Sequence, residues 1–73
     1  RQDAEVYAAD LAAGQTIRYA LPAGRGAWLQ LGKGKVTVNG QAIEAGDGVA
    51  VSDEAEVVIE AQADAHFLLF DLK

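Results

Sequence analysis

Few side chains of this sequence could take part in catalysis or bind a metal ion. His66 is the only histidine, and there is no cysteine. His66 begins the apolar run 66–70, and the nearby Asp64 is too close in the sequence to form a site with it alone. A transition-metal ion needs several nitrogen, oxygen or sulfur donors that converge on one point. We therefore expect His66 to lie on the surface of a strand, without a catalytic or metal-binding role.

A hydrolytic triad could in principle be drawn from Ser52, His66 and Asp71, which supply the three residue types. Ser52, however, lies in an acidic turn. It lacks the strand–turn–helix setting that exposes a nucleophilic serine in hydrolases. We therefore predict no catalytic residue in this chain.

Two charged turns are also better explained by structure than by ligand binding. The acidic residues Asp53, Glu54 and Glu56 lack the spacing of a calcium-binding loop, so we interpret them as a solvated turn. The run 32–35 reads Gly-Lys-Gly-Lys and lies between two expected strands. Phosphate binding by such a run relies on the amides of a following helix, so we interpret this run as a turn too.

Composition limits the classes of function. The net charge of −5 at neutral pH repels phosphate backbones, which disfavours nucleic-acid binding. Without cysteine there is no disulfide framework. No apolar run approaches about 20 residues, so we expect no transmembrane helix, and without a recognisable signal peptide we expect a cytoplasmic protein. The chain begins with Arg1 instead of Met, as a fragment of a longer protein would.

Alternation with a period of two dominates the sequence and predicts strands. Ala27, Leu29 and Leu31 share one face of a strand and Trp28 and Gln30 the other. Similar alternation places together Ile17, Tyr19 and Leu21; Val36 and Val38; Val49 and Val51; and Val57 and Ile59. The segment 3–13 is also expected to be a strand. Turn signals at short spacing separate these runs, and this arrangement is typical of an all-β sandwich or barrel.

The best-defined turn is Asn39-Gly40, between the short runs 35–38 and 41–44. Asn-Gly suits a two-residue hairpin turn because both central residues need a positive φ. A second turn follows at Gly46-Asp47-Gly48. These features predict an antiparallel hairpin in the middle of the chain.

In their order, several segments resemble the C-terminal half of pirin-like proteins, which are bicupins with two cupin barrels in one chain. The segments are 2–7, 25–30, 34–40, 47–48, 52–54 and 68–72, which read QDAEVY, RGAWLQ, GKVTVNG, DG, SDE and LLFDL. The resemblance implies one cupin domain over residues 1–73, with the double-stranded β-helix fold, a small jelly-roll-like barrel.

The same resemblance places the metal ligands of cupins on positions that hold none here. Cupin sites use a His-x-His pattern and a Glu before the glycine-rich strand, which correspond to positions near Leu21, Ala23 and Ala27. The later histidine would lie within 54–58, which reads Glu-Ala-Glu-Val-Val. In pirin-like proteins the metal is a feature of the N-terminal barrel. We therefore expect no metal and no cofactor in this chain.

Three functions stay open at this point. The first is a non-catalytic structural and interaction module of a pirin-like protein. The second is a metal-free barrel that binds a small molecule. The third is part of a quercetin 2,3-dioxygenase-like enzyme whose metal-bearing barrel lies outside this chain. For the chain by itself, we do not expect enzymatic activity.

The apolar residues predict a contact surface. Only 22 hydrophobic residues larger than alanine are present beside 15 alanines, so the core is thin. Trp28 faces away from Leu29 and Leu31, and the run 66–70 is apolar on both faces. Either these side chains are covered within the domain, or Trp28, Phe67, Leu68 and Phe70 form an interface. The partner would be a second copy, giving a homodimer, or a sister cupin barrel.

Overall fold

The computed structural model describes residues 4–72, and eight strands make up this part of the chain. They are β1 (Ala4–Leu11), β2 (Thr16–Ala20), β3 (Gly26–Lys33), β4 (Lys35–Val38), β5 (Gln41–Glu44), β6 (Gly48–Ser52), β7 (Glu56–Ala61) and β8 (Ala65–Leu72). The described residues contain no helix, and so none that could span a membrane.

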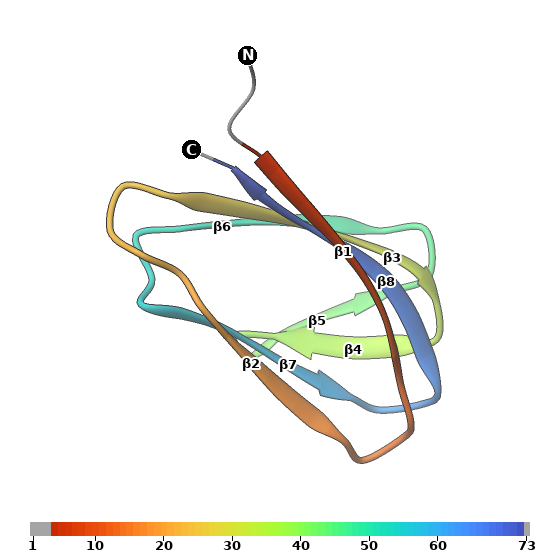
Figure 1. Ribbon diagram of the computed structural model, residues 1–73. Helices are drawn as coiled ribbons and strands as arrows, with labels where there is room; N and C mark the ends of the chain where they lie inside the picture. Colours follow the sequence, from red (N-terminus) through yellow and green to blue (C-terminus); the bar gives the residue numbers. More distant parts are fainter. Residues whose placement is uncertain (1–3, 73) are drawn as a thin grey trace.

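The strands form two four-stranded sheets, ordered β1-β8-β3-β6 and β2-β7-β4-β5. Every pairing is antiparallel. Figure 1 shows the two sheets facing each other, with the ends of β1 and β8 that lead to the chain termini close together. The all-β prediction is confirmed.

The space between the sheets is filled by the residues that the alternation placed on one face. Leu29, Leu31, Val36, Val57 and Ile59 have no exposed surface. The other buried apolar residues are Leu11, Leu21, Ala27, Val38, Ile43, Val51, Ala61, Ala65, Phe67 and Leu69. Burial of apolar surface is the main favourable term in folding, and here each strand contributes through its inward face alone.

The Asn39-Gly40 turn lies where it was predicted and has the predicted conformation. Both residues have positive φ, 48° at Asn39 and 86° at Gly40. The Asn39 side chain also ties the turn to β7: its Nδ2 donates to the carbonyl of Glu56, and its Oδ1 accepts from the amide of Val58. The hairpin is therefore held by a neighbouring strand as well as by its own ladder.

Two boundaries differ from the prediction. Strand β3 continues through Gly32 to Lys33 and β4 begins at Lys35, so the turn expected over 32–35 contracts to Gly34, the one residue between the two strands. The register between β3 and β8 shifts between Leu31 and Lys33, as in a β-bulge. Strand β1 confirms the strand predicted over 3–13 as far as Leu11, whereas Ala12 and Ala13 belong to the following turn and Asp3 lies outside the described residues.

Candidate functional site

The outer surface of the sheet β1-β8-β3-β6 presents an apolar row that crosses all four strands. The pairing sets Val6 beside Phe70, Phe70 beside Trp28, and Trp28 beside Ala50. The rows on either side are also uncharged. We call the whole set the apolar face: Val6, Ala8, Gly26, Trp28, Gln30, Gly48, Ala50, Ser52, Leu68, Phe70 and Leu72.

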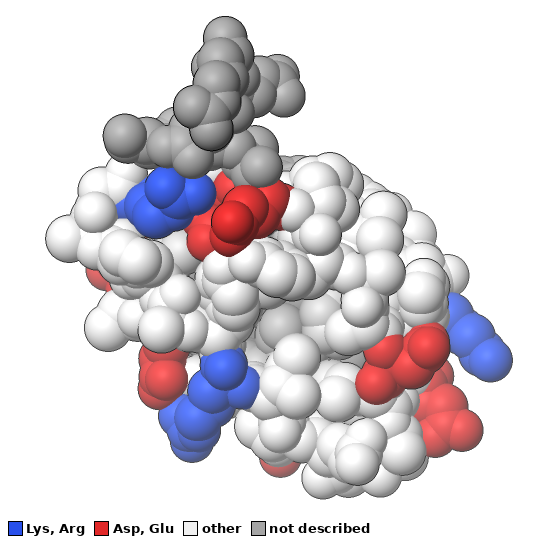
Figure 2. All heavy atoms as spheres, viewed as in Figure 1, with Lys and Arg blue, Asp and Glu red and all other residues white. Residues whose placement is uncertain are grey.

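Several large side chains of the apolar face are open to solvent. The exposed fraction is 56% for Val6, 42% for Leu72 and 39% for Trp28, while Leu68 and Phe70 are half-buried. Figure 2 views this sheet from the edge where β1 crosses in front, and uncharged atoms make up most of the surface between the charged residues there. Scattered apolar residues on a surface are ordinary, but a contiguous patch rimmed by polar residues is typical of a contact surface.

Trp28 is held in a fixed place on this face. A Cβ atom at Gly48 would overlap Cζ2 of the indole and lie 2.8 Å from Cε2, so the ring lies directly over the glycine. The indole Nε1 donates to Oε1 of Gln30 at 3.2 Å. The Gln30 amide in turn donates to the carbonyls of Gly46 and Asp47, each at 3.3 Å. Because Gly48 has no side chain, the indole can lie directly on its backbone, and we call this position the seat of Trp28.

A second feature, at the end of the barrel near the termini, is polar and partly buried. Tyr19 on β2 donates its hydroxyl to Oδ2 of Asp71 at 2.5 Å, and Arg25 donates Nε to Oδ1 at 2.7 Å. Asp71 lies on β8 and is only 4% exposed. We call Tyr19, Arg25 and Asp71 the polar latch, because they join one sheet to the other at this end.

The hydrogen bonds of the polar latch control its protonation. Burial opposes ionisation of Asp71, but hydrogen bonds from Tyr19 and Arg25, with the charge of Arg25, outweigh it and lower the pKa of Asp71. The same hydrogen bond to Asp71 raises the pKa of Tyr19, helped by contact with the Tyr7 hydroxyl at 3.4 Å. Asp71 is therefore a carboxylate and Tyr19 a neutral phenol at neutral pH. Each is stabilised in the state that keeps the latch closed.

The candidate triad does not assemble. Ser52 points out from the sheet on the apolar face, whereas Asp71 points inward and is engaged in the polar latch. His66 lies on the outer side of β8 and contacts Asp10 of β1 instead, with 2.8 Å between Nδ1 and Oδ1. As expected, His66 is an exposed histidine on a strand.

The three upstream positions that correspond to cupin metal ligands, near Leu21, Ala23 and Ala27, hold apolar side chains, whereas the downstream window 54–58 contains Glu54 and Glu56. Leu21 and Ala27 are buried in the core, and Val57 is fully buried beside them in the same cluster. Among residues 4–72, no three histidine, aspartate or glutamate side chains are grouped closely enough to hold a metal ion. The residues at these positions therefore do not fit a metal centre.

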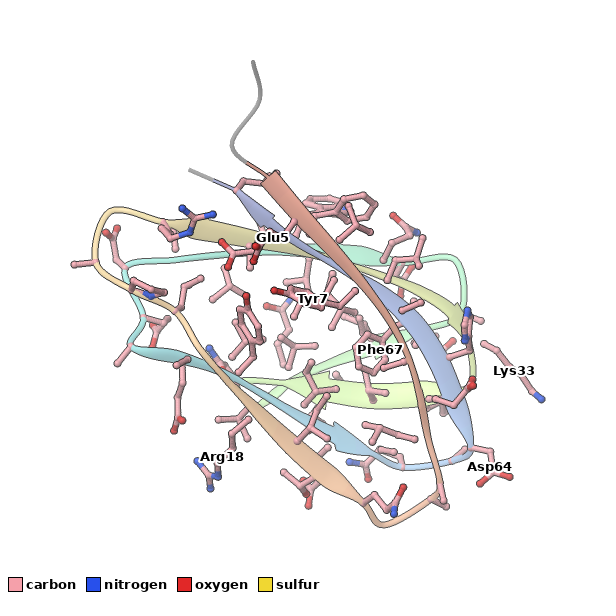
Figure 3. The ribbon with its side chains drawn as sticks, in the orientation of Figure 1. Glu5, Tyr7, Arg18, Lys33, Asp64 and Phe67 are labelled. Carbon is pink, nitrogen blue, oxygen red and sulfur yellow. The ribbon has the colours of Figure 1, made fainter. Side chains whose placement is uncertain are left out.

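The predicted interface residues divide between two locations. Trp28, Leu68 and Phe70 lie together on the apolar face. Phe67 does not: it is 1% exposed and lies between the sheets (Figure 3), so its place in the predicted interface is corrected. The physical reason is the alternation itself, which sends Phe67 and Leu69 inward and their neighbours outward.

Three aspects of the site were not anticipated from the sequence. Gly48 was interpreted only as part of a turn, although it supports the indole of Trp28. Tyr19, Arg25 and Asp71 are far apart along the chain, and nothing in their spacing pointed to contact. Val6 and Leu72 were not predicted to be contact residues, because the outward positions of a strand with one buried face are usually polar.

The comparisons with known proteins agree with this architecture. Residues 1–72 match the family described as the quercetinase C-terminal cupin domain. A pirin-like protein of Caulobacter vibrioides is 44% identical over 71 residues, which is 97% of this chain and 31% of that protein. A quercetin 2,3-dioxygenase of Escherichia coli K12 is 39% identical over 71 residues, with the same two coverages.

A solved structure matches equally well. The bacterial pirin YhhW of Escherichia coli, in complex with nickel(II), superposes with a TM-score of 0.95 at 39% identity. The match covers 97% of this chain and 31% of that one. The chain thus spans about a third of the length of the relatives it matches.

Proposed function

The chain belongs to the quercetinase C-terminal cupin domain family, and from this premise we propose that it is a non-catalytic cupin barrel that serves as a structural and interaction module. In this proposal its partner is another cupin barrel. Chemistry of the quercetin 2,3-dioxygenase type belongs to a metal-bearing barrel outside these 73 residues.

The observation that carries this proposal is the content of the barrel. A catalytic cupin needs polar donors that converge inside the barrel, together with room for a substrate. Here Leu21, Ala27 and Val57 are buried in the apolar core. Inward-facing polar groups of the polar latch are already bonded to one another. The interior is suited to holding two sheets together.

The relatives support the division of labour without transferring their activity. The Escherichia coli pirin was solved with nickel(II), and this chain matches 31% of its length. A metal site elsewhere in such a protein is compatible with a metal-free barrel here. Under this proposal, no residue of the present chain binds the metal ion.

Metal content and turnover test the proposal. The purified chain, incubated with nickel(II) or iron(II) and dialysed, should retain far less than one metal ion per chain by elemental analysis. It should also leave quercetin unchanged. The nickel-binding Escherichia coli relative, treated in parallel, provides the positive control. One tightly held metal per chain, or oxidation of quercetin that His66→Ala abolishes, would overturn the proposal.

A second candidate function, binding of a small molecule without a metal, is favoured by one observation. The loop residues 21–26 and 52–55 line an open pocket beside the polar latch. A ligand that binds only the folded state raises the melting temperature. A thermal-shift screen in which quercetin and related flavonoids raise the melting temperature of the chain, but not of a variant with a blocked pocket such as Ala23→Trp, would favour this candidate. The cytoplasmic location stays a prediction.

A further inference from the structure

The turn between β4 and β5 holds the only asparagine of the chain, Asn39, directly before Gly40. We infer that Asn39 is a modification site. It deamidates spontaneously to aspartate or isoaspartate, with water as the co-reactant, and its contacts with β7 hold this reaction back while the barrel is folded. The modification, once made, weakens the hairpin. This inference goes beyond the proposed function and does not depend on it.

The reaction uses groups that adjoin each other in the chain. The Gly40 amide nitrogen gives its proton to solvent base and attacks Cγ of Asn39, and no side chain on the glycine hinders this attack. The bond between Cγ and Nδ2 breaks, and Nδ2 leaves as ammonia after taking up a proton. Water then adds to either carbonyl of the resulting cyclic imide. Opening of the ring gives aspartate, or isoaspartate in which the main chain runs through the former side chain.

The turn is open to these reactants. Asn39 and Gly40 are both exposed, so water and base reach them. No atom lies within 4 Å of the position that a Cβ of Gly40 would take, so there is space around the attacking nitrogen. Asparagine is among the thermolabile residues of proteins. Burial therefore does not protect Asn39, and its protection depends on its hydrogen bonds.

Strand β7 binds Asn39 at three points. The backbone amide of Asn39 donates to the carbonyl of Val58 at 2.9 Å. The amide of Val58 donates to Oδ1 at 2.6 Å, and Nδ2 donates to the carbonyl of Glu56 at 3.1 Å. The side chain thus continues the ladder between β4 and β7 beyond Val38, the last paired residue of β4. Attack at Cγ makes the planar amide tetrahedral and folds the side chain back onto its own backbone, so both side-chain hydrogen bonds must break.

The product does not fit the same contacts. A carboxylate has no N–H to donate, so the oxygen that replaces Nδ2 faces the carbonyl oxygen of Glu56 without a hydrogen between them. The new negative charge joins a chain of net charge −5, and Glu54 lines the same open pocket as Asn39. Isoaspartate also lengthens the main chain of a tight turn whose length sets the register of the hairpin. Deamidation therefore loosens the hairpin from β7.

Peptide mass spectrometry of the wild-type chain tests the protection. The chain is kept at mildly alkaline pH, either in plain buffer or in enough urea to unfold it, and the fragment that holds Asn39 gains mass as NH2 is replaced by OH. In the folded chain the reaction follows the population of open forms, so conversion should be faster in urea by about tenfold or more. A synthetic peptide of residues 36–43 controls for urea itself and should convert equally fast in both solutions. Equal rates for the folded and the unfolded chain, or no conversion in urea, would overturn the inference.

The same assay in urea tests the route, without any dependence on folding. Gly40→Ala should convert several times more slowly than the wild type, because the methyl group hinders the attacking nitrogen. Equally fast conversion of Gly40→Ala would mean that the Gly40 nitrogen is not the nucleophile, and the inference would be wrong.

Asn39→Asp carries the side chain of the product and tests the consequence. Its melting temperature should fall by roughly 4 to 8 °C, the shift expected for the loss of one hydrogen bond in a small domain. Gln41→Glu is the matched control, because Gln41 is exposed in the same hairpin and takes up the same charge without removing a hydrogen bond to β7. It should melt as the wild type does. Equal melting temperatures for these two variants would show that the contacts with β7 do not distinguish the amide from the carboxylate, which contradicts the inference.

Discussion

The two sheets of this barrel have similar inner faces and very different outer faces. The outer side of β2-β7-β4-β5, the charged face, carries Arg18, Lys35, Glu44, Glu56 and Glu60. Arg18 pairs with Glu56 at 2.8 Å, and Lys35 lies 4.0 Å from Glu44. Figure 3 shows Arg18 pointing away from the barrel. The strands of β2-β7-β4-β5 alternate between apolar inward residues and polar outward residues, as expected of an antiparallel sheet with one face in water. The sheet β1-β8-β3-β6 is instead apolar on both its inner and its outer side.

This difference separates residues that fill the core of the barrel from apolar residues that lie on its surface. A strand with one wet face needs apolar residues at every second position only. On β3 and β8 the additional outward Trp28, Leu68, Phe70 and Leu72 are not needed to close the core. Substitutions on each face should therefore have different effects on the stability of the barrel.

The largest effect is expected at the polar latch, which joins the two sheets and belongs to neither outer face. Asp71→Ala should lower the free energy of unfolding by roughly 2 to 4 kcal/mol, because it leaves Arg25 and Tyr19 without their shared acceptor in a poorly solvated place. Chemical denaturation followed by circular dichroism measures this loss. A change below about 1 kcal/mol would mean that the sheets are held together by the apolar core alone.

The polar latch also predicts a loss of stability in acid. The folded pKa of Asp71 lies below its ordinary value of 3.8, so the unfolded chain takes up this proton first as the pH falls. The stabilisation is complete above the ordinary value and is lost as the pH falls through the folded pKa. The free energy of unfolding should therefore be steady above about pH 5 and fall as the pH drops through 3.8 and further. Asp71→Asn should show a shallower decline than the wild type, and parallel curves would contradict this.

A turn in the charged sheet should give the next largest effect. Gly40 has a φ of 86°, a conformation that a β-branched residue adopts only with strain. Gly40→Val should cost roughly 1 to 3 kcal/mol and lower the melting temperature. Gly40→Asn, which tolerates positive φ better, serves as the control and should lie between the variant and the wild type. Equal melting temperatures for all three would show that the turn relaxes to another conformation.

On the apolar face, the seat of Trp28 predicts a smaller change in stability but a clear spectroscopic one. In the Gly48→Ala variant the added Cβ would overlap the indole ring of Trp28, so the ring must move outward. Because Trp28 is already 39% exposed, we expect a change of less than about 1 kcal/mol in unfolding free energy. Trp28 is the only tryptophan, so its fluorescence emission should shift to longer wavelength. An unchanged spectrum would mean that the ring is not held over Gly48.

The smallest effect is expected on the charged face. The ion pair between Arg18 and Glu56 is largely exposed, with side-chain exposures of 64% and 44%, so solvent and salt screen it. Replacing both residues by glutamine should change the unfolding free energy by less than about 1 kcal/mol. A loss well above this value would show that the pair is less screened than its exposure indicates.

The sequence by itself determined the strands, their inward faces and the central hairpin. Alternation identified Leu29 and Leu31 as core residues, and Asn39-Gly40 fixed the turn, because both signals depend on neighbours along the chain. The residue types near Leu21 and Ala27 also led to the prediction of no metal site in this chain, which stays a prediction. Trp28 was recognised as facing away from the core for the same local reason.

Only the tertiary structure decided which outward residues meet. Val6, Phe70, Trp28 and Ala50 form one row because β1, β8, β3 and β6 are neighbours in the sheet, although they are far apart in sequence. The same holds for the polar latch, whose residues come from two strands and a loop. The order of the strands in a sheet depends on how the whole chain packs, so it cannot be predicted from a local sequence pattern. The alternation therefore predicts that a residue points outward, and the packing of the strands decides what it lies beside.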